Sequence, residues 1–216
     1  TINTFTTGEG ENSSVRRFVT GNRCERGAEL DGAQIYFAAG EYVLNPSASP
    51  IVVNFESYNE GVDTKYCDIT LLGGYSPSLT GIDVYERDIE QYKTTLTAGA
   101  GTAGLMEIQD AAHIGFDGFS FIGIKGGRVF YINKGYIFMN RCCIYSTQGV
   151  STWGASVSSS AFTLVNNSTF AHQSKCNNGS FGGKNFVFCN STLVQMTPAF
   201  EGLLRVAGSG YAYVIN

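Results

Sequence analysis

The side chains best suited to chemistry in this sequence are carboxylates, and the largest group of them lies between residues 56 and 90. Two carboxylates at a suitable separation can hydrolyse a glycosidic bond, and carboxylates that hold Ca²⁺ beside a base can cleave uronate polymers. After Asp117, however, Glu201 is the only acidic residue. The group consists of Glu56, Glu60, Asp63, Asp68, Asp83, Glu86, Asp88 and Glu90. We interpret it as two solvated loops, and we predict no catalytic residue, no metal site and no cofactor.

The histidines and cysteines give no stronger indication of a site. His113 and His172 each stand beside a predicted strand end, where a lone histidine is more often a surface or corner residue than a ligand. The six cysteines show no CxxC spacing and have no histidine companions, which argues against zinc.

Aromatic side chains in predicted loops are the best candidates for contact with a ligand. Sugar rings stack their apolar faces on aromatic rings, and loops on a rigid scaffold often carry binding residues. Trp153 lies in a Ser/Thr/Gly-rich stretch, residues 146–160, that lengthens one repeat. Ordinary packing is the alternative for each candidate. The predicted ligand-binding residues are Trp153, Tyr58, Tyr85 and Tyr92.

A short repeat over residues 105–216 must position these side chains. Equivalent apolar runs end at intervals of 23, 26 and 23 residues (117 to 140, 140 to 166, 166 to 189). Asn tolerates left-handed backbone angles at a corner, and stacked Asn side chains can hydrogen-bond at the strand spacing of about 4.8 Å. A row of metal or sugar ligands is the alternative interpretation. The predicted structural ladder consists of Asp117, Asn140, Asn166, Asn190 and Asn216.

The repeat predicts the fold class. Alternating β-branched and aromatic residues give about three short strands per repeat, and two dozen residues leave no room for helical connections between parallel strands. We therefore predict an all-β fold, a right-handed single-stranded parallel β-helix with three short strands per coil. Residues 1–30 are assigned to an N-terminal arm or cap and residues 31–216 to the β-helix. We expect further coils, or another domain or chain, to cover the C-terminal coil.

Composition narrows the class of partner. The net charge is −4 and the chain has no Lys/Arg cluster, so nucleic acid is not an expected partner. No apolar run reaches the length that spans a membrane, so the sequence predicts no membrane span.

Several motifs in the first half resemble the opening coils of pectin-lyase-like, right-handed β-helix surface proteins. The motifs are Ile35-Tyr-Phe-Ala-Ala-Gly-Glu-Tyr42, Ile69-Thr-Leu-Leu-Gly-Gly-Tyr-Ser-Pro77, Arg87-Asp88, Thr95-Leu-Thr97 and Gly118-Phe-Ser-Phe-Ile-Gly123. Such chains are common in gut Bacteroidetes and among polymorphic outer-membrane and adhesin-like proteins. The resemblance, which covers about residues 30–125, implies a secreted or cell-surface location, at the bacterial outer membrane or outside the cell.

This fold hosts lyases, hydrolases and adhesins alike, so the resemblance does not by itself fix the function. We expect a non-catalytic surface protein that acts in adhesion or contacts a polysaccharide or a host or cell-surface glycan. One alternative is a polysaccharide lyase or glycoside hydrolase whose site lies partly outside this chain. The other is a structural segment of a larger surface assembly.

Overall fold

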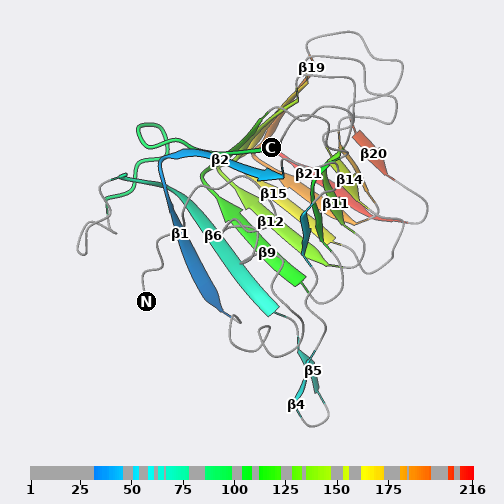
Figure 1. Ribbon diagram of the computed structural model, residues 1–216. Coiled ribbons are helices and arrows are strands. Elements are labelled where there is room, and N and C mark those ends of the chain that lie inside the picture. Colours follow the sequence, from blue (N-terminus) through cyan, green and yellow to red (C-terminus); the bar gives the residue numbers. More distant parts are fainter. Residues whose placement is uncertain are drawn as a thin grey trace.

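Figure 1 shows the computed structural model, in which all the regular structure of the described residues is strand. The structure describes residues 32–45, 51–53, 58–60, 63–65, 67–77, 86–98, 104–108, 112–122, 128–132, 135–146, 153–155, 162–172, 181–183, 185–195, 204–206 and 210–216. The predicted N-terminal arm or cap, residues 1–30, lies outside these ranges. No helix in the described part is long and apolar enough to cross a membrane.

The two largest sheets are parallel throughout (Figure 1). One has seven strands, in the spatial order β1 (Ala33–Ala38), β6 (Cys67–Tyr75), β9 (Ala112–Asp117), β12 (Tyr136–Asn140), β15 (Phe162–Asn166), β18 (Phe186–Cys189) and β21 (Ala212–Ile215). The other has six, in the order β2 (Gly40–Asn45), β7 (Thr94–Ala98), β10 (Phe119–Ile122), β13 (Cys143–Ser146), β16 (Thr169–His172) and β19 (Thr192–Gln195).

Three smaller sheets complete the described structure. A four-stranded parallel sheet contains β3 (Ile51–Val53), β8 (Gly104–Ile108), β11 (Arg128–Ile132) and β14 (Trp153–Ala155). A parallel pair is formed by β17 (Phe181–Gly183) and β20 (Leu204–Val206). An antiparallel pair is formed by β4 (Tyr58–Glu60) and β5 (Asp63–Lys65), where the sequence predicted only a polar loop.

Strands of the two large sheets alternate along the chain. Each strand of the seven-stranded sheet before β21 is followed by a strand of the six-stranded sheet or, in one case, by the short excursion that leads to it. Consecutive strands within one sheet are therefore about one repeat apart in sequence. The predicted all-β architecture of stacked parallel strands is confirmed, and it is consistent with a parallel β-helix.

The core forms where the inward faces of the two large sheets meet. Side chains alternate between the two faces of each strand, so every second residue points inward. Phe121, with no exposed surface, packs against Phe116 and Phe119 at ring-centroid distances of 5.3 and 6.1 Å. Phe37 of β1 extends this cluster, since its ring lies 5.3 Å from that of Phe119. Aromatic residues from successive coils thus pack on one another along the stack.

A row of buried hydroxyls ties the corners between the two large sheets. The backbone N–H of Cys142 donates to Ser168 Oγ (3.0 Å), and the N–H of Ser168 donates to Ser191 Oγ (2.9 Å). Ser168 Oγ in turn donates to the carbonyl oxygen of Asn166 (2.7 Å). The row ends at Asn216, whose Oδ1 accepts a hydrogen bond from the N–H of Ser191 (3.2 Å). This contact, and not an amide–amide bond, is how the structure uses Asn216 of the predicted ladder.

We expect Ser168→Ala to lower the free energy of unfolding by about 1–3 kcal/mol, because the buried N–H of Cys142 loses its acceptor. Urea unfolding would measure the loss. The matched control is Ser120→Ala on the outer face of β10, which should change stability by no more than about 0.5 kcal/mol. Equal losses in the two variants would show that the buried row does not stabilise the corners.

Candidate functional site

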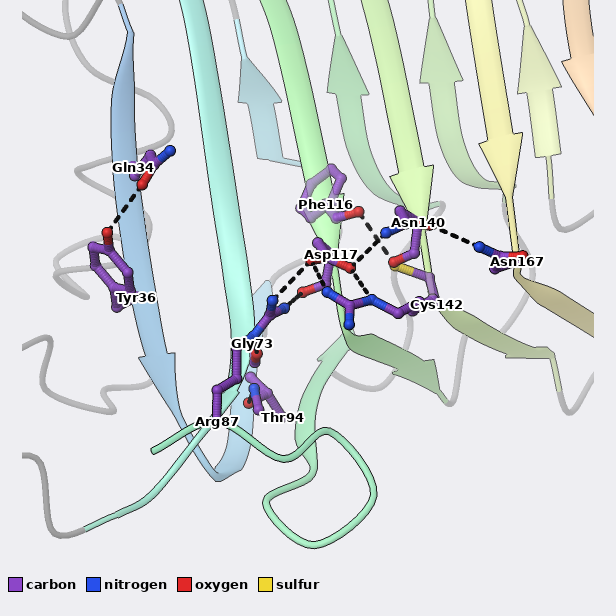
Figure 2. Close-up of polar contacts among 12 residues, drawn as sticks. Gln34, Tyr36, Gly73, Arg87, Thr94, Phe116, Asp117, Asn140, Cys142 and Asn167 are labelled. Carbon is purple, nitrogen blue, oxygen red and sulfur yellow. Dashed lines mark hydrogen bonds and ion pairs between the residues drawn. The ribbon is translucent and has the colours of Figure 1, made fainter. Parts of the chain in front are cut away.

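Charged contacts converge on Asp117, the last residue of β9. Figure 2 shows Arg87 and Asn140 pointing toward its carboxylate; Arg87 Nη1 lies 2.9 Å from Oδ2, and Asn140 Nδ2 lies 3.1 Å from Oδ1. Arg141 donates from Nε to Oδ1 at 2.9 Å and from Nη2 to Oδ2. Arg87 also donates from Nε to the carbonyl oxygen of Gly73 (2.8 Å) and thereby links β6 to β9.

These donors hold the pKa of Asp117 below its usual value. Partial burial alone would raise that pKa, but the hydrogen bonds from Arg141 and Arg87, together with their positive charges, outweigh the effect of burial. The same pairing raises the pKa of Arg141. Asp117 is therefore ionised at neutral pH, and a carboxylate in that state cannot donate a proton as a general acid.

Two glycines let the segment that carries Arg87 approach this corner. Gly74 and Gly118 have φ angles of +88° and +74°, in the left-handed region that favours glycine. At either position, a Cβ would lie only 2.6 Å from Cγ2 of Ile89. The close approach of Ile89 places Arg87, two residues earlier, within reach of Asp117.

The predicted ladder occupies two neighbouring columns. Asp117, Asn140 and Asn166 share one register position at the ends of β9, β12 and β15, and Asn166 Nδ2 donates to Asn140 Oδ1 at 3.2 Å. The residue that continues this register in β18 is Cys189, so Asn190 lies one place later. The left-handed angles also lie one place later than predicted, because the corner begins after the last paired residue of each strand. They occur at Gly118, Arg141, Asn167 and Asn190.

A groove of about 710 Å³ lies on the outer face of the seven-stranded sheet. Its lining residues come from β6, β9, β12 and β15, so it crosses four neighbouring strands. Inward-facing residues of the same strands, such as Ile114 and Ile137, are buried. The side chains that shape the groove are therefore the outward-facing alternates of these strands.

The parallel register arranges nine of these outward positions as a three-by-three grid on β6, β9 and β12. Successive positions along a strand are about 6.6 Å apart, and neighbouring strands are about 4.8 Å apart. The three columns are Asp68, His113 and Tyr136; Thr70, Gly115 and Phe138; and Leu72, Asp117 and Asn140. The groove thus has an aromatic and acidic rim, a floor with a glycine at its centre, and a rim rich in amide and carboxylate groups.

The aromatic rim is held by close contacts. His113 Nδ1 lies 2.7 Å from Asp68 Oδ1, and the imidazole stacks on the ring of Tyr136 with centroids 4.3 Å apart and planes 11° apart. The ring of Phe162 meets Tyr136 edge-on at 5.9 Å. The predicted turn at His113 is wrong, because β9 already begins at Ala112. His113 instead contributes a fixed ring to the wall of the groove.

The structure does not bring the four predicted aromatic residues together. Tyr92 lies in the segment that carries Arg87, where its hydroxyl donates to Glu86 Oε1 (2.8 Å), and it does not line the groove. Trp153 is in β14 and Tyr58 is in β4, but their side chains lie outside the described part. Tyr85 falls entirely outside the described residues.

Sequence reasoning missed His113, Gly115, Tyr136 and Phe138 as site residues. The available signal was the alternation within each strand combined with the repeat interval. An interval of 23 residues places Gly115 beside Phe138 (115 to 138) in the same way as it places Asp117 beside Asn140. Applying the interval to every outward position would have indicated the floor of the groove.

The described residues contain no group of three or more His, Cys, Asp or Glu side chains that could hold a metal ion. Comparison of the chain with protein-family models, with curated proteins and with solved structures found no match.

Proposed function

We propose that this protein is a secreted or cell-surface β-helix that binds a polysaccharide, or a host or cell-surface glycan, in the groove of the seven-stranded sheet. The observation that carries the proposal is an elongated groove across four stacked strands with aromatic side chains on one rim and Asn side chains on the other. We also propose a right-handed coil with three strands per turn, as in the pectin-lyase-like surface proteins that the sequence resembles.

The groove suits a sugar chain in both shape and chemistry. It runs across the strands, so a linear polymer would lie along the stacking direction and meet an equivalent residue about every 4.8 Å. Tyr136 and Phe138 offer aromatic surface for the apolar faces of sugar rings. Asn140 and Asn166 offer amide groups for the hydroxyls on the opposite rim.

The placement of the carboxylates favours binding over hydrolysis. Asp68 and Asp117 lie on neighbouring strands but four residues apart in register, so their Cα atoms are separated by roughly 14 Å. Glycoside hydrolases place their two carboxyl groups about 5–9.5 Å apart. Asp117 is moreover engaged by two arginines. We therefore propose a non-catalytic role, in adhesion or glycan contact, for the groove.

Calorimetric titration with soluble polysaccharides (laminarin, mannan, xylan and polygalacturonate) tests the proposal. We expect at least one to bind, and Tyr136→Ala and Phe138→Ala to weaken that binding roughly 10-fold or more. The control is Val194→Ala, an exposed residue of β19 in the other large sheet, which should bind as the unsubstituted protein does. Absence of binding, or unchanged affinity in both groove variants, would contradict the proposed function.

A further inference from the structure

We propose that the vacancy above Gly115 is a subsite for one uncharged pyranose ring. This inference rests on the glycan-binding function proposed for the groove. Gly115 is the centre of the three-by-three grid and the only grid position without a side chain. Its neighbours are His113 and Asp117 along the strand, and Thr70 and Phe138 across it.

The fold does not require glycine at this position. The φ angle of Gly115 lies outside the left-handed region, and the nearest atoms to a built Cβ are Thr70 Oγ1 at 3.4 Å and Thr70 Cγ2 at 3.5 Å. Both distances are ordinary van der Waals contacts. Gly74 and Gly118 differ, because their φ angles and the contact with Ile89 exclude a side chain.

Glycine inside a strand is unfavourable unless something uses the open space. It costs about 0.5–1 kcal/mol relative to alanine, and in a strand it often marks a place where a ligand approaches the backbone closely. At Gly115, the missing side chain gives the groove open floor between Thr70 and Phe138, two strand spacings or about 9.6 Å apart. That opening matches a single six-membered ring lying on the backbone of β9.

The rim of the vacancy has the chemistry of a pyranose ring. The ring of Phe138, 38% exposed, and the side chain of Leu72 can cover the apolar C–H face. The Thr70 hydroxyl, the paired Asp68 and His113 side chains and the Asn140 amide can exchange hydrogen bonds with ring hydroxyls.

The charges around the vacancy disfavour an acidic sugar. The Asp68 carboxylate is 66% exposed at one end, where it would repel a uronate carboxylate. At the other end, both guanidinium groups already direct their donors to Asp117. An anionic ring would therefore meet a like charge without gaining an uncommitted arginine. The geometry points to a neutral hexose or pentose unit.

Gly115→Val tests the subsite, because valine fills the vacancy and is well suited to a strand. We expect its affinity for the neutral polysaccharides laminarin, mannan and xylan to fall at least about 50-fold, with thermal stability retained. The matched control is Ser120→Val on the outer face of the six-stranded sheet, which should bind as the unsubstituted protein does. Polygalacturonate should bind the unsubstituted protein more weakly than the best neutral polymer.

The outcomes separate this inference from the function on which it rests. Binding that is lost in Phe138→Ala but kept in folded Gly115→Val would overturn the subsite and leave the groove as the binding site. Preferential binding of polygalacturonate would overturn the uncharged ring. If the unsubstituted protein binds none of the polymers, both the proposed function and the subsite are wrong. If Gly115→Val fails to fold, Gly115→Ala is measured instead, with at least a fivefold loss expected and unchanged affinity contradicting the subsite.

Discussion

Phe121→Ala is expected to lower the free energy of unfolding by about 3–5 kcal/mol, the range for truncating a fully buried aromatic side chain. Phe121 has no exposed surface and contacts the rings of Phe116 and Phe119. Its removal would leave a cavity where the two large sheets meet, lined by groups from successive coils that cannot collapse without moving their strands. Equilibrium unfolding in guanidinium chloride, followed by circular dichroism, would measure the loss.

The matched control is Ile122→Ala, one residue later in the same strand. Ile122 points to the outer face of β10 and is 38% exposed, so its truncation should cost no more than about 1 kcal/mol. The contrast between adjacent residues tests the strand assignment itself, because it depends on alternation between the two faces. Similar losses for the two variants would mean that residues 119–122 are not a strand with one buried face.

Arg87→Ala is expected to lower the free energy of unfolding by about 2–3 kcal/mol. Its guanidinium is only 19% exposed, and it donates to Asp117 Oδ2, to the backbone oxygen of Asp117 and to that of Gly73. Losing these donors leaves two partly buried carbonyl oxygens and a carboxylate short of partners. Urea unfolding at pH 7 would measure the effect. Arg141→Ala is the control, with no more than about 1 kcal/mol expected, because Arg141 is 43% exposed and its pairing is screened by solvent.

Acid should narrow the difference between Arg87→Ala and the unsubstituted protein. The folded-state pKa of Asp117 lies below its ordinary value of 3.8, so the ion pair contributes fully above that value and is lost as the pH falls through the folded pKa. A gap in stability that stays constant from pH 7 to below the folded pKa would show that the ionised carboxylate is not what Arg87 stabilises.

The fold was largely predictable because its signals are local and recur. Alternating apolar residues in 112–117, 119–122 and 136–140 identify strands, and a near-constant interval aligns them without knowledge of the turns. The hairpin of β4 and β5 has neither signal, since residues 56–66 are mostly polar and occur once. A single polar hairpin is set by its turn and by its surroundings, which periodicity does not report.

The corner cluster shows what periodicity leaves out. Arg87 and Asp117 are 30 residues apart and come from an excursion and a strand end, so no repeat interval connects them. Their contact depends on Gly74 and Gly118, whose left-handed angles permit the approach of Ile89. The same effect explains the shift in the predicted left-handed corner: Gly118 already occupied that place in the first of the aligned repeats.

The groove was predictable in part. The interval of 23 residues sets Gly115 beside Phe138, but the pairing of His113 with Asp68 spans 45 residues and crosses the excursion. Loop aromatics such as Tyr92 were favoured because loops commonly carry binding residues. In this chain, the described aromatic surface that gathers into a groove belongs to strands, where stacking of equivalent positions builds a continuous wall.

In-register stacking of parallel strands builds both the buried core and the groove, and inter-strand proton contacts in solution test it most directly. Nuclear Overhauser measurements on the isotopically labelled protein should show short backbone contacts from Phe138 to Gly115 on one side and to Leu164 on the other. Contacts should then advance in the same direction along both neighbours, from Met139 to Phe116 and to Val165. Contacts that advance in opposite directions, or their absence between these strands, would contradict the stacked architecture and the groove that depends on it.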